Sequence, residues 1–451
     1  MSKSLKLAGL AAVSMIALTS AASAGGFALR EQSVSGLGNA FAGAAAGGAG
    51  LGSMFWNPAT MTNFAGIQTS LGLFAIMPVS KITPTSATNA YLSSYTAAGD
   101  TGDMAQDALL PSGYASWQFN DQVWLGLSVN TPFGLVTQNP HNWSGQVFGR
   151  TSKVASVNVT PTLGYRFNDQ FSVGVGIQLM QFKVRLTSAN ASGTTSGLPN
   201  SFFSNAASGE LKGDDMAVGF TLGATYKPFA GTELGIGYRS QVKPKLEGTF
   251  LTPGGVSASA LSDGITGSAT PYDIRSDLAL PDQVTVGLRQ QISNDVTLLA
   301  GFEWTHWAKF SRFPIYTTAG VKANTLVFDY KNAWYTSLGG EYSYNKNWTL
   351  RAGVGFEHSP INNENRSVRL PDSNRTWASL GATYKLDDRI SFDASYAHLF
   401  AKSGTITSTV TGTAITFYGD TKGRVDIFAI GLNYKLGDQP KKVATKAMIT
   451  K

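Results

Sequence analysis

The sequence predicts an all-β protein, a transmembrane antiparallel β-barrel of about 14 strands over residues 65–436. Very short polar turns alternate along the chain with longer segments rich in Gly, Ser and Thr. The stretches between them run for about ten to fifteen residues and alternate apolar and polar positions. Tight turns at one end and long loops at the other are typical of an outer-membrane barrel. The short turns are Asn120-Asp121, Asn168-Asp169, Pro228 to Gly231, Ser293 to Asp295, Asn345 to Asn347, and Asp387-Asp388.

The alternation shows which solvent each strand face meets. In residues 155–167 the odd positions are apolar, as at Val157 and Leu163, and the even positions are polar or small, as at Asn158 and Thr162. A soluble β-sandwich alternates in the same way, but here aromatic residues precede the short turns and the end of the last strand. Such rings form a girdle at a membrane interface, so the apolar face is predicted to meet lipid. These aromatics are Tyr165, Phe167, Tyr226, Tyr342, Tyr344, Tyr384 and Tyr434.

Counting strands between turns places both ends of the barrel on the short-turn, periplasmic side. A barrel of this size is too wide to be filled by its own wall side chains, so it is either an open channel or plugged. The predicted strands are 65–79, 110–119, 121–133, 153–167, 171–187, 211–227, 232–248, 272–292, 295–309, 327–344, 347–359, 372–386, 389–402 and 424–436.

The first 24 residues are predicted to be a secretory signal peptide. Lys3 and Lys6 precede an apolar stretch at 7–18 that is too short to span a bilayer, and Ala22-Ser23-Ala24 is a small-residue cleavage site. Residues 25–64 then carry only two charges, Arg30 and Glu31, and do not alternate. We expect this apolar segment to fold into the lumen as a hatch.

Composition excludes several classes of site. With no cysteine there are no disulfides, thiolate metal sites or thiol nucleophiles. The four histidines are scattered, and no phosphate-binding loop or G-x-S-x-G elbow occurs, so we predict no catalytic residues, metal or cofactor. The net charge of +7 is mild, and the basic tail at 437–451 is read as a solvated periplasmic end rather than a nucleic-acid arm.

Residues 27–61 resemble the hatch of the long-chain fatty acid outer-membrane transporters, the FadL family. The resemblance continues in order through the barrel and covers nearly the whole mature chain. Its pieces are Ser35-Gly36-Leu37-Gly38, Ala40-Phe41-Ala42-Gly43, Asn57-Pro58-Ala59, the run from Thr131 to Thr137 with Trp143, Trp304 with Trp307, Asn365-Arg366-Ser367, and Leu370-Pro371-Asp372 with Arg375 and Trp377.

The resemblance implies a fourteen-stranded barrel closed by a hatch at Ser35, Gly36, Leu37, Gly38, Asn57, Pro58 and Ala59. It implies that hydrophobic molecules reach a pocket inside the barrel and leave sideways where the third strand kinks, at Pro132, Phe133 and Gly134. The residues alone leave two readings: proline and glycine either end that strand at a loop or bend it. The resemblance favours the bend.

The resemblance also suggests substrate contacts. Lys183 and Lys331 match its basic positions, with Arg185 nearby, and such groups suit a carboxylate through charge-assisted hydrogen bonds. Each lysine could equally be snorkelling at a strand end. Phe27 and Leu29 either touch substrate or pack within the hatch. One departure is the tail after Leu436, because family members end at an aromatic residue that closes the last strand.

We therefore expect a monomer in the outer membrane of a Gram-negative bacterium that passively imports long-chain fatty acids and contacts outer-membrane lipid. Uptake of aromatic hydrocarbons by the same mechanism is the alternative. A polar-solute porin would have an open lumen, which the apolar residues 25–64 oppose. An adhesin would use the long loops and need no lumenal pocket, and an enzyme would need a serine without a local motif.

Overall fold

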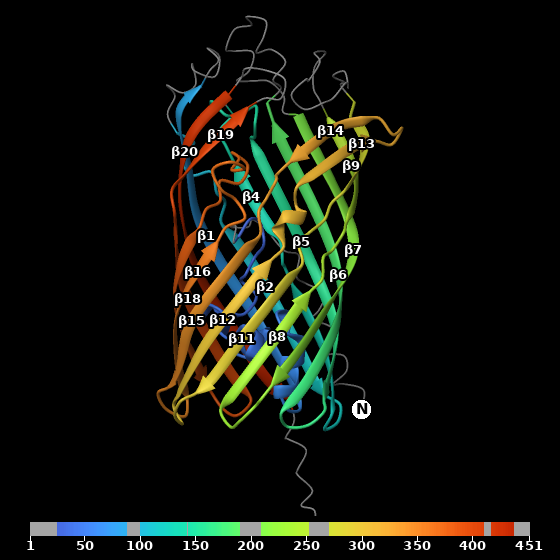
Figure 1. Cartoon of the computed structure of the whole chain (residues 1–451). Coiled ribbons are helices and arrows are strands. Elements are labelled where there is room, and N and C mark those ends of the chain that lie inside the picture. The colour runs from blue at the N-terminus through green and yellow to red at the C-terminus, as the bar shows by residue number, and fades with distance from the viewer. Residues whose placement is uncertain are drawn as a thin grey trace, which may run out of the picture.

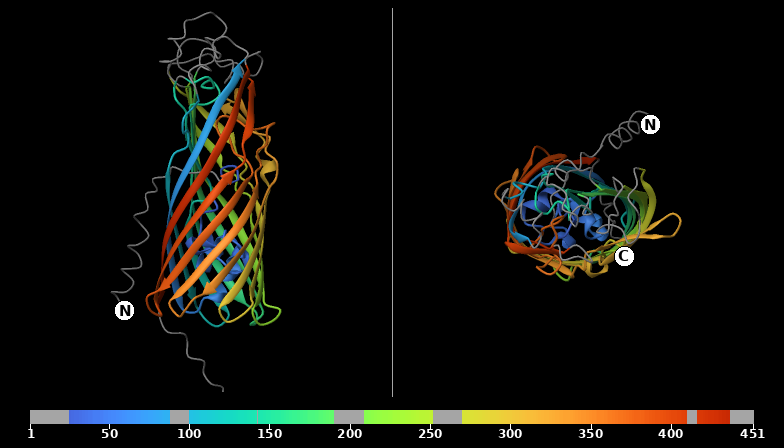
Figure 2. Two further views of the ribbon diagram at one scale, coloured as in Figure 1. Left: turned by 90° about the vertical axis from the view of Figure 1, so that its left-hand side faces the viewer. Right: turned by 90° about the horizontal axis from the view of Figure 1, so that it is seen from above.

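The computed structural model describes residues 25–87, 100–141, 143–189, 209–251, 270–409 and 416–436. The predicted signal peptide at 1–24 and the tail at 437–451 lie outside these ranges. The described chain forms a single closed antiparallel sheet around a filled lumen (Figures 1 and 2). The predicted fold class is confirmed.

The wall of the barrel is a ring of fourteen strands within the described residues, each paired with the next, and β1 pairs with β20 to close it. The ring strands are β1 (Ile67–Ala87), β2 (Ala108–Gln118), β3 (Val123–Asn130), β5 (Thr151–Arg166), β6 (Phe171–Ser188), β7 (Gly209–Tyr226), β8 (Thr232–Arg239), β11 (Gln283–Gln291), β12 (Val296–Thr305), β15 (Ala333–Ser343), β16 (Trp348–His358), β17 (Arg375–Lys385), β18 (Ile390–Ala401) and β20 (Thr416–Leu436).

Shorter strands extend the wall at the end away from the tight turns (Figure 1). They are β4 (Gly134–Gln138), β9 (Lys245–Leu251), β10 (Tyr272–Asp277), β13 (Arg312–Thr317), β14 (Lys322–Val327) and β19 (Gly404–Thr409).

In most of the tight turns, the side chain of the first polar residue accepts hydrogen bonds from backbone amides later in the turn. The side-chain oxygen of Asn120 accepts hydrogen bonds from the amides of Gln122 at 2.9 Å and Val123 at 2.8 Å. Asn168, Ser293, Asn345 and Asp387 bond to the amides two and three residues on in the same way. These side chains replace the ladder bonds that end at the turn, which explains why Asn, Asp and Ser occupy it.

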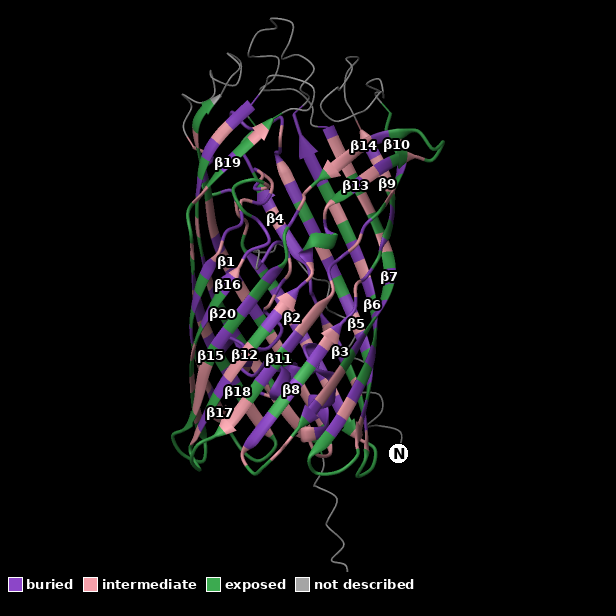
Figure 3. Cartoon of the chain, in the orientation of Figure 1, coloured by how far each residue is buried: buried purple, intermediate pink, exposed green. Residues whose placement is uncertain are grey.

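The two faces of each wall strand differ as the alternation predicts (Figure 3). Large apolar side chains such as Ile177, Val218 and Leu338 are exposed on the outer face. Near the tight turns, aromatic rings pair on the same face, for example Trp348 with Tyr384 at 4.9 Å. An outer surface of this kind is stable in hydrocarbon bounded by an interfacial girdle.

Residues 25–64 lie inside the barrel (Figure 2) as short helical pieces. Asn57 caps the last piece by accepting from the amide of Ala59, and Pro58 occupies its first turn. No helix in the described ranges is long and apolar enough to cross a membrane. The pieces are α2 (Val34–Gly38), η1 (Ala44–Ala46), η2 (Gly50–Phe55) and η3 (Pro58–Asn63), and η5 (Trp307–Lys309) lies between β12 and β13.

Glycines of the wall let this segment lie directly against the strands. A Cβ at Gly235 would collide with the carbonyl oxygen of Ala45, and one at Gly237 with that of Trp56. Glycine weakens a strand, but here it permits the close approach of a second backbone. The spacing between wall and lumenal segment is therefore set by backbone contact, while Leu37 and Met61 fill the centre and are fully buried.

Candidate functional site

The third wall strand is interrupted. β3 ends at Asn130 and β4 begins at Gly134, and both pair with β5, through Asn130 to Asn158 and Gly134 to Ala155. Four steps along the interrupted strand thus correspond to three along β5, which makes a bulge of one residue. The side chain of Ser156 bonds to both the amide and the carbonyl of Phe133 and holds the bulge on this side.

On the side that faces β2, the segment after β3 has no paired wall strand. β2 pairs with β3 only as far as Gly113 opposite Val129, and residues 108–112 pair with β1 alone. The next contact is an isolated bridge between Ala105 and Thr137. Within the described chain, residues 131–136 therefore form a break in the wall ladder. The three residues predicted to line a lateral opening, Pro132, Phe133 and Gly134, lie in this break.

The N-terminal arm, which we define as residues 25–33, occupies the place that β2 leaves. Ala28 forms a bridge with Phe133. The amide of Leu29 donates to the carbonyl of Pro132 at 2.8 Å, and the amide of Gly134 donates to the carbonyl of Phe27 at 2.9 Å. The edge of the kinked strand is thus satisfied by the arm and not by the wall.

The ring of Phe27 anchors the arm in an aromatic cluster. Its centroid lies 4.9 Å from that of Trp307, 5.0 Å from that of Phe310 and 5.8 Å from that of Phe133. Most of these contacts are edge-on or tilted, the arrangement that aromatic quadrupoles favour. Because Phe133 belongs to the break, the cluster joins the arm, the break and the η5 segment.

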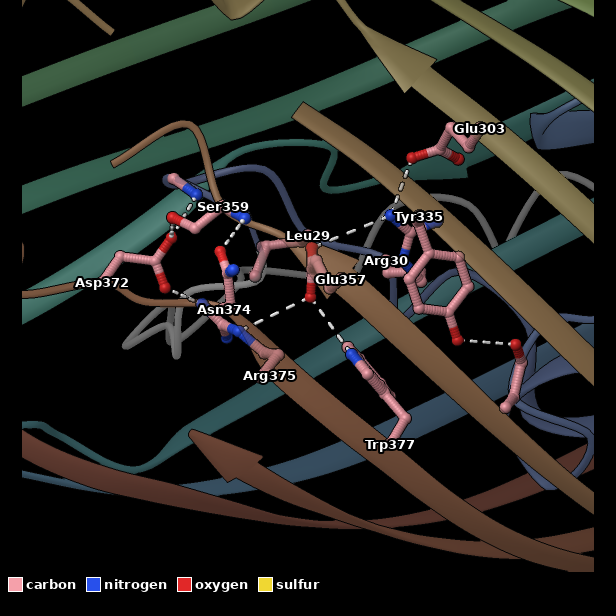
Figure 4. Close-up of polar contacts among 12 residues, drawn as sticks. Leu29, Arg30, Glu303, Tyr335, Glu357, Ser359, Asp372, Asn374, Arg375 and Trp377 are labelled. Atoms are coloured by element: carbon pink, nitrogen blue, oxygen red, sulfur yellow. Dashed lines mark hydrogen bonds and ion pairs between the residues drawn. The ribbon is translucent and has the colours of Figure 1, made fainter. Parts of the chain in front are cut away.

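Ion pairs hold the polar part of the arm (Figure 4). Arg30 donates to Glu303 at 2.7 Å, lies 3.8 Å from Glu357, and stacks on the ring of Tyr335. Arg375 pairs with Glu357 and with Asp372. A buried charge without a partner is strongly destabilising, so removing any one of these residues would leave the others with an uncompensated charge.

Two further residues of the arm, Gly26 and Glu31, lie close to these charges. The amide of Gly26 donates to Asp372 at 2.9 Å, so the start of the arm is tied to the loop before β17. Glu31 is buried, and one of its carboxylate oxygens has no hydrogen-bond partner among the described residues. Burial raises the pKa of Glu31, because a charged carboxylate is poorly solvated there.

An apolar pocket lies on one side of the arm. It is formed by the arm, the kinked strand, the upper parts of β5, β6 and β9, and the segment around β13. Its main apolar lining residues are Phe27, Leu135, Val154, Phe182, Leu186, Leu246, Leu278, Phe310, Phe313, Ile315, Phe328, Tyr330 and Leu370. A cavity with this lining suits a hydrocarbon or an aromatic ring.

A second cavity is also lined by the arm and is more polar. Its lining includes Leu29, Arg30, Arg239, Glu303 and Glu357, and also Pro132 and Phe133 of the break. The arm therefore lines both cavities and also contacts the wall break. Arg239 contacts the lumenal segment too, because it donates to the carbonyl of Phe55 at 2.9 Å and stacks on that ring.

The predicted hatch residues lie inside the barrel, in packing and capping positions. Ser35, Gly36, Leu37 and Gly38 belong to α2, and a Cβ at Gly38 would lie 2.9 Å from the Cα of Gly381 in β17. Asn57, with Pro58 and Ala59 after it, donates to the carbonyl of Ala224 in β7 at 2.9 Å. Of the other predicted contacts, Phe27 lines the apolar pocket and Leu29 the second cavity.

The structure does not bring Lys183 and Arg185, which are predicted to contact substrate, to the pocket. Along β6 the even-numbered residues, such as Phe182, face inward, and Lys183 and Arg185 lie on the exposed outer face. Arg185 pairs there with Glu210 at 2.7 Å. Successive side chains of a strand point to opposite faces, so shifting an assignment by one residue moves it from the lumen to the outer surface. A match of residue type between two sequences does not reveal such a shift.

Lys331 is also exposed and does not line the apolar pocket, although its neighbour Tyr330 does. Arg369, in the loop between β16 and β17, is a basic residue that does line the pocket. The only features that the sequence analysis identified in this loop are the two motifs that flank Arg369, Asn365-Arg366-Ser367 and Leu370-Pro371-Asp372. Nothing in the residue pattern distinguishes Arg369 from a solvated loop cation.

A fourteen-strand barrel with an apolar outer face, a lumen filled by its own N-terminal segment and a break in the wall defines the class of outer-membrane transport barrels. The chain matches, over residues 15–436, the family described as outer membrane protein transport protein (OMPP1/FadL/TodX). It belongs to this family and is an outer-membrane transport protein.

Curated relatives cover nearly the whole chain. A long-chain fatty acid transport protein of Salmonella typhi is 26% identical over 435 residues, which are 94% of this chain and 97% of the relative. Outer membrane protein P1 of Haemophilus influenzae is 26% identical over 87% of this chain and 90% of its own.

Solved structures share the fold. A Pseudomonas aeruginosa FadL homologue superposes with a TM-score of 0.81 at 23% identity, covering 91% of this chain and all (100%) of that one. The toluene transporter TodX of Pseudomonas putida superposes with a TM-score of 0.60 at 16% identity, covering 92% of this chain and 100% of that one.

Proposed function

We propose that the protein takes up long-chain fatty acids by passive movement, through the apolar pocket and sideways out of the wall at residues 131–136. The observation that carries this proposal is the position of the arm, which lines the pocket with Phe27 and bonds to the break through Pro132 and Gly134. One segment thus contacts both the binding site and the exit. The relatives named for long-chain fatty acid transport support the substrate class.

The sideways exit follows from solvation. A hydrocarbon chain gains nothing by entering water in the periplasm, but each methylene transferred to an apolar environment is favourable by about 0.8 kcal/mol. The break lies between wall strands whose outer faces are apolar, so a substrate leaving there meets lipid directly. In this proposal residues 25–64 are the hatch that denies water a path, and the arm must leave the kinked strand for substrate to pass.

The mature chain begins near Gly25 after removal of residues 1–24, acts as a monomer, and catalyses no reaction. Residues 437–451 remain in the periplasm.

Aromatic hydrocarbons are a second candidate substrate class. The pocket presents the rings of Phe182, Phe310, Phe313 and Phe328, which suit a small arene as well as an alkyl chain. The structural likeness to a toluene transporter agrees with this candidate.

Uptake of labelled oleate and of labelled toluene by cells that lack their own outer-membrane transporter tests both candidates. Gly134→Arg places a charged side chain in the break, and Gln138→Arg adds the same side chain at an exposed position of the same strand. We expect the first variant to abolish uptake and the second to retain it, at equal amounts of folded barrel. Transport by Gly134→Arg at the wild-type rate would contradict the lateral exit.

A further inference from the structure

Arg369 enters the apolar pocket from the loop between β16 and β17. Its Nη1 donates to the carbonyl oxygens of Thr187 at 3.1 Å and Thr151 at 3.2 Å, and lies 3.4 Å from the hydroxyl of Ser152. These acceptors belong to the upper ends of β5 and β6, so the guanidinium is tied to the wall at one nitrogen. The stem packs beside Gly149, where a Cβ would lie 3.0 Å from the Cγ of Arg369.

The rest of the guanidinium is unoccupied by protein. In the described part of the chain, Nε and Nη2 of Arg369 have no hydrogen-bond partner, and no ion pair joins this arginine to a carboxylate. Two other arginines of the lumen are paired with carboxylates: Arg30 with Glu303, and Arg351 with Glu341. Burial lowers the pKa of Arg369, but arginine starts from above 12 and stays protonated at neutral pH.

A charge in this position favours one kind of ligand. Nε and Nη2 form an edge of the guanidinium that matches the two oxygens of a carboxylate. The pocket beside them is lined by Phe182, Phe310 and Phe313 and would bury a hydrocarbon chain. A partly buried cation without a counter-ion is costly, and an anionic ligand would remove that cost while its apolar part fills the pocket.

We propose that Arg369 is the anchor for the carboxylate of an amphipathic substrate, with the hydrocarbon chain lying among the phenylalanines of the apolar pocket. The inference rests on the proposed function and narrows the substrate to molecules that carry an acidic head group. It replaces the assignment of that role to Lys183, Arg185 and Lys331, which lie outside the pocket.

Other charges at the pocket do not compete for this role. Lys212 lines the rim, but its side chain is 56% exposed and lies 3.8 Å from Glu210. Glu247 also lines the rim and would repel a carboxylate placed there. The head group is therefore held at the Arg369 end of the pocket.

Binding of oleate and of oleyl alcohol to the full-length purified barrel in detergent tests the inference, because the two ligands share a chain and differ in charge. We expect wild type to prefer oleate. Arg369→Gln should weaken oleate binding by about 10- to 100-fold, the usual worth of hydrogen bonds to a charged group, and leave oleyl alcohol nearly unchanged. Lys183→Gln, which removes an exposed cation, should change neither.

Arg369→Lys is the second variant, because it keeps the charge and the reach to the strand carbonyls but lacks the paired nitrogens. It should bind oleate with intermediate affinity, and the migration of unheated protein on a gel reports whether each variant is folded. Equal binding of oleate and oleyl alcohol by wild type, or an equal loss of both in folded Arg369→Gln, would overturn the inference and leave the apolar pocket as a binding site. Failure of wild type to bind either ligand would instead count against the proposed function.

Discussion

The carbonyl oxygen of Phe27 accepts a hydrogen bond from the amide of Gly134 at 2.9 Å, so the N-terminal arm pairs with the kinked wall strand 107 residues later. The arm supplies the backbone hydrogen bonds that β2 does not make to this part of the strand. The arm is held by these backbone bonds, by the ring of Phe27 and by the ion pairs of Arg30. Its release would leave the pairing between wall strands intact, so it costs less than unfolding the barrel.

Phe27→Ala should release the arm from the wall break. Truncating a buried phenylalanine costs about 3–5 kcal/mol, and here that loss falls on docking of the arm because the wall ladder is untouched. We expect the amide of Gly134 to exchange its hydrogen at least about 100-fold faster, as measured by hydrogen exchange. Phe167→Ala, at an exposed girdle position, should leave this rate unchanged, and equal rates in wild type and Phe27→Ala would show that the ring is not the anchor.

Arg30→Gln should destabilise the protein strongly. It leaves Glu303 and Glu357 buried with less positive charge, and breaking a buried pair costs about 3–5 kcal/mol. Arg312→Gln is the matched control, because its pair with Asp329 is exposed to solvent and should contribute little to stability. Thermal unfolding of the two purified variants gives the comparison, and similar shifts in both would contradict a structural role for the buried pair.

Glu31 should make the stability of the docked arm depend on pH. Burial raises its pKa in the folded state, so the folded protein holds a proton that the unfolded chain releases at its ordinary carboxyl pKa. Stability from this group is present at acidic pH and falls as pH rises above the ordinary carboxyl range, by about 1.4 kcal/mol for each unit of pKa shift. The charged groups that face it are Arg30, Arg375 and Glu357.

Glu31→Gln removes the carboxyl group whose pKa is raised in the folded protein and replaces it with a neutral side chain of nearly the same shape. Hydrogen exchange of the Leu29 amide, measured at pH 5 and pH 8, should show a loss of protection at the higher pH in wild type and a smaller loss in the variant. An identical pH dependence in both would assign the effect to other groups.

Gly237→Ala should displace the lumenal segment. The added methyl group meets the carbonyl oxygen of Trp56, which is backbone and cannot rotate away. Gly340→Ala is the control, because its nearest atom would lie at an ordinary 3.6 Å. Single-channel recording in planar bilayers should show larger or more frequent openings for Gly237→Ala than for Gly340→Ala, and equal, closed behaviour would mean that the segment adapts without moving.

Much of the architecture was predictable because it is local. Alternation along residues 155–167, Asn or Asp at the tight turns and aromatics before them are each properties of neighbouring residues, and they correctly predicted the ring of wall strands. Pro132 and Gly134 alone left open whether the third strand ends or bends there, and only the family resemblance favoured the bend. These residues alone did not show what would replace the lost neighbour.

The residue pattern did not identify which residue of β6 lines the pocket. Lys183 and Phe182 are adjacent, and only the inward or outward register of β6 decides which of them lines the pocket. Arg369 shows the converse case, because a loop residue with no periodic pattern acquires its role from where the loop enters the barrel.

The sequence by itself determined the class of barrel, its turns and its lipid-facing surface, because each depends on residues close together in the chain. Only the tertiary structure decided that Phe27 pairs with Gly134, that Arg30 meets Glu303 and that Arg369 reaches the pocket. Those contacts join residues 107, 273 and up to 218 positions apart. Closure of the ring and filling of its lumen place them together, and no short-range pattern records that geometry.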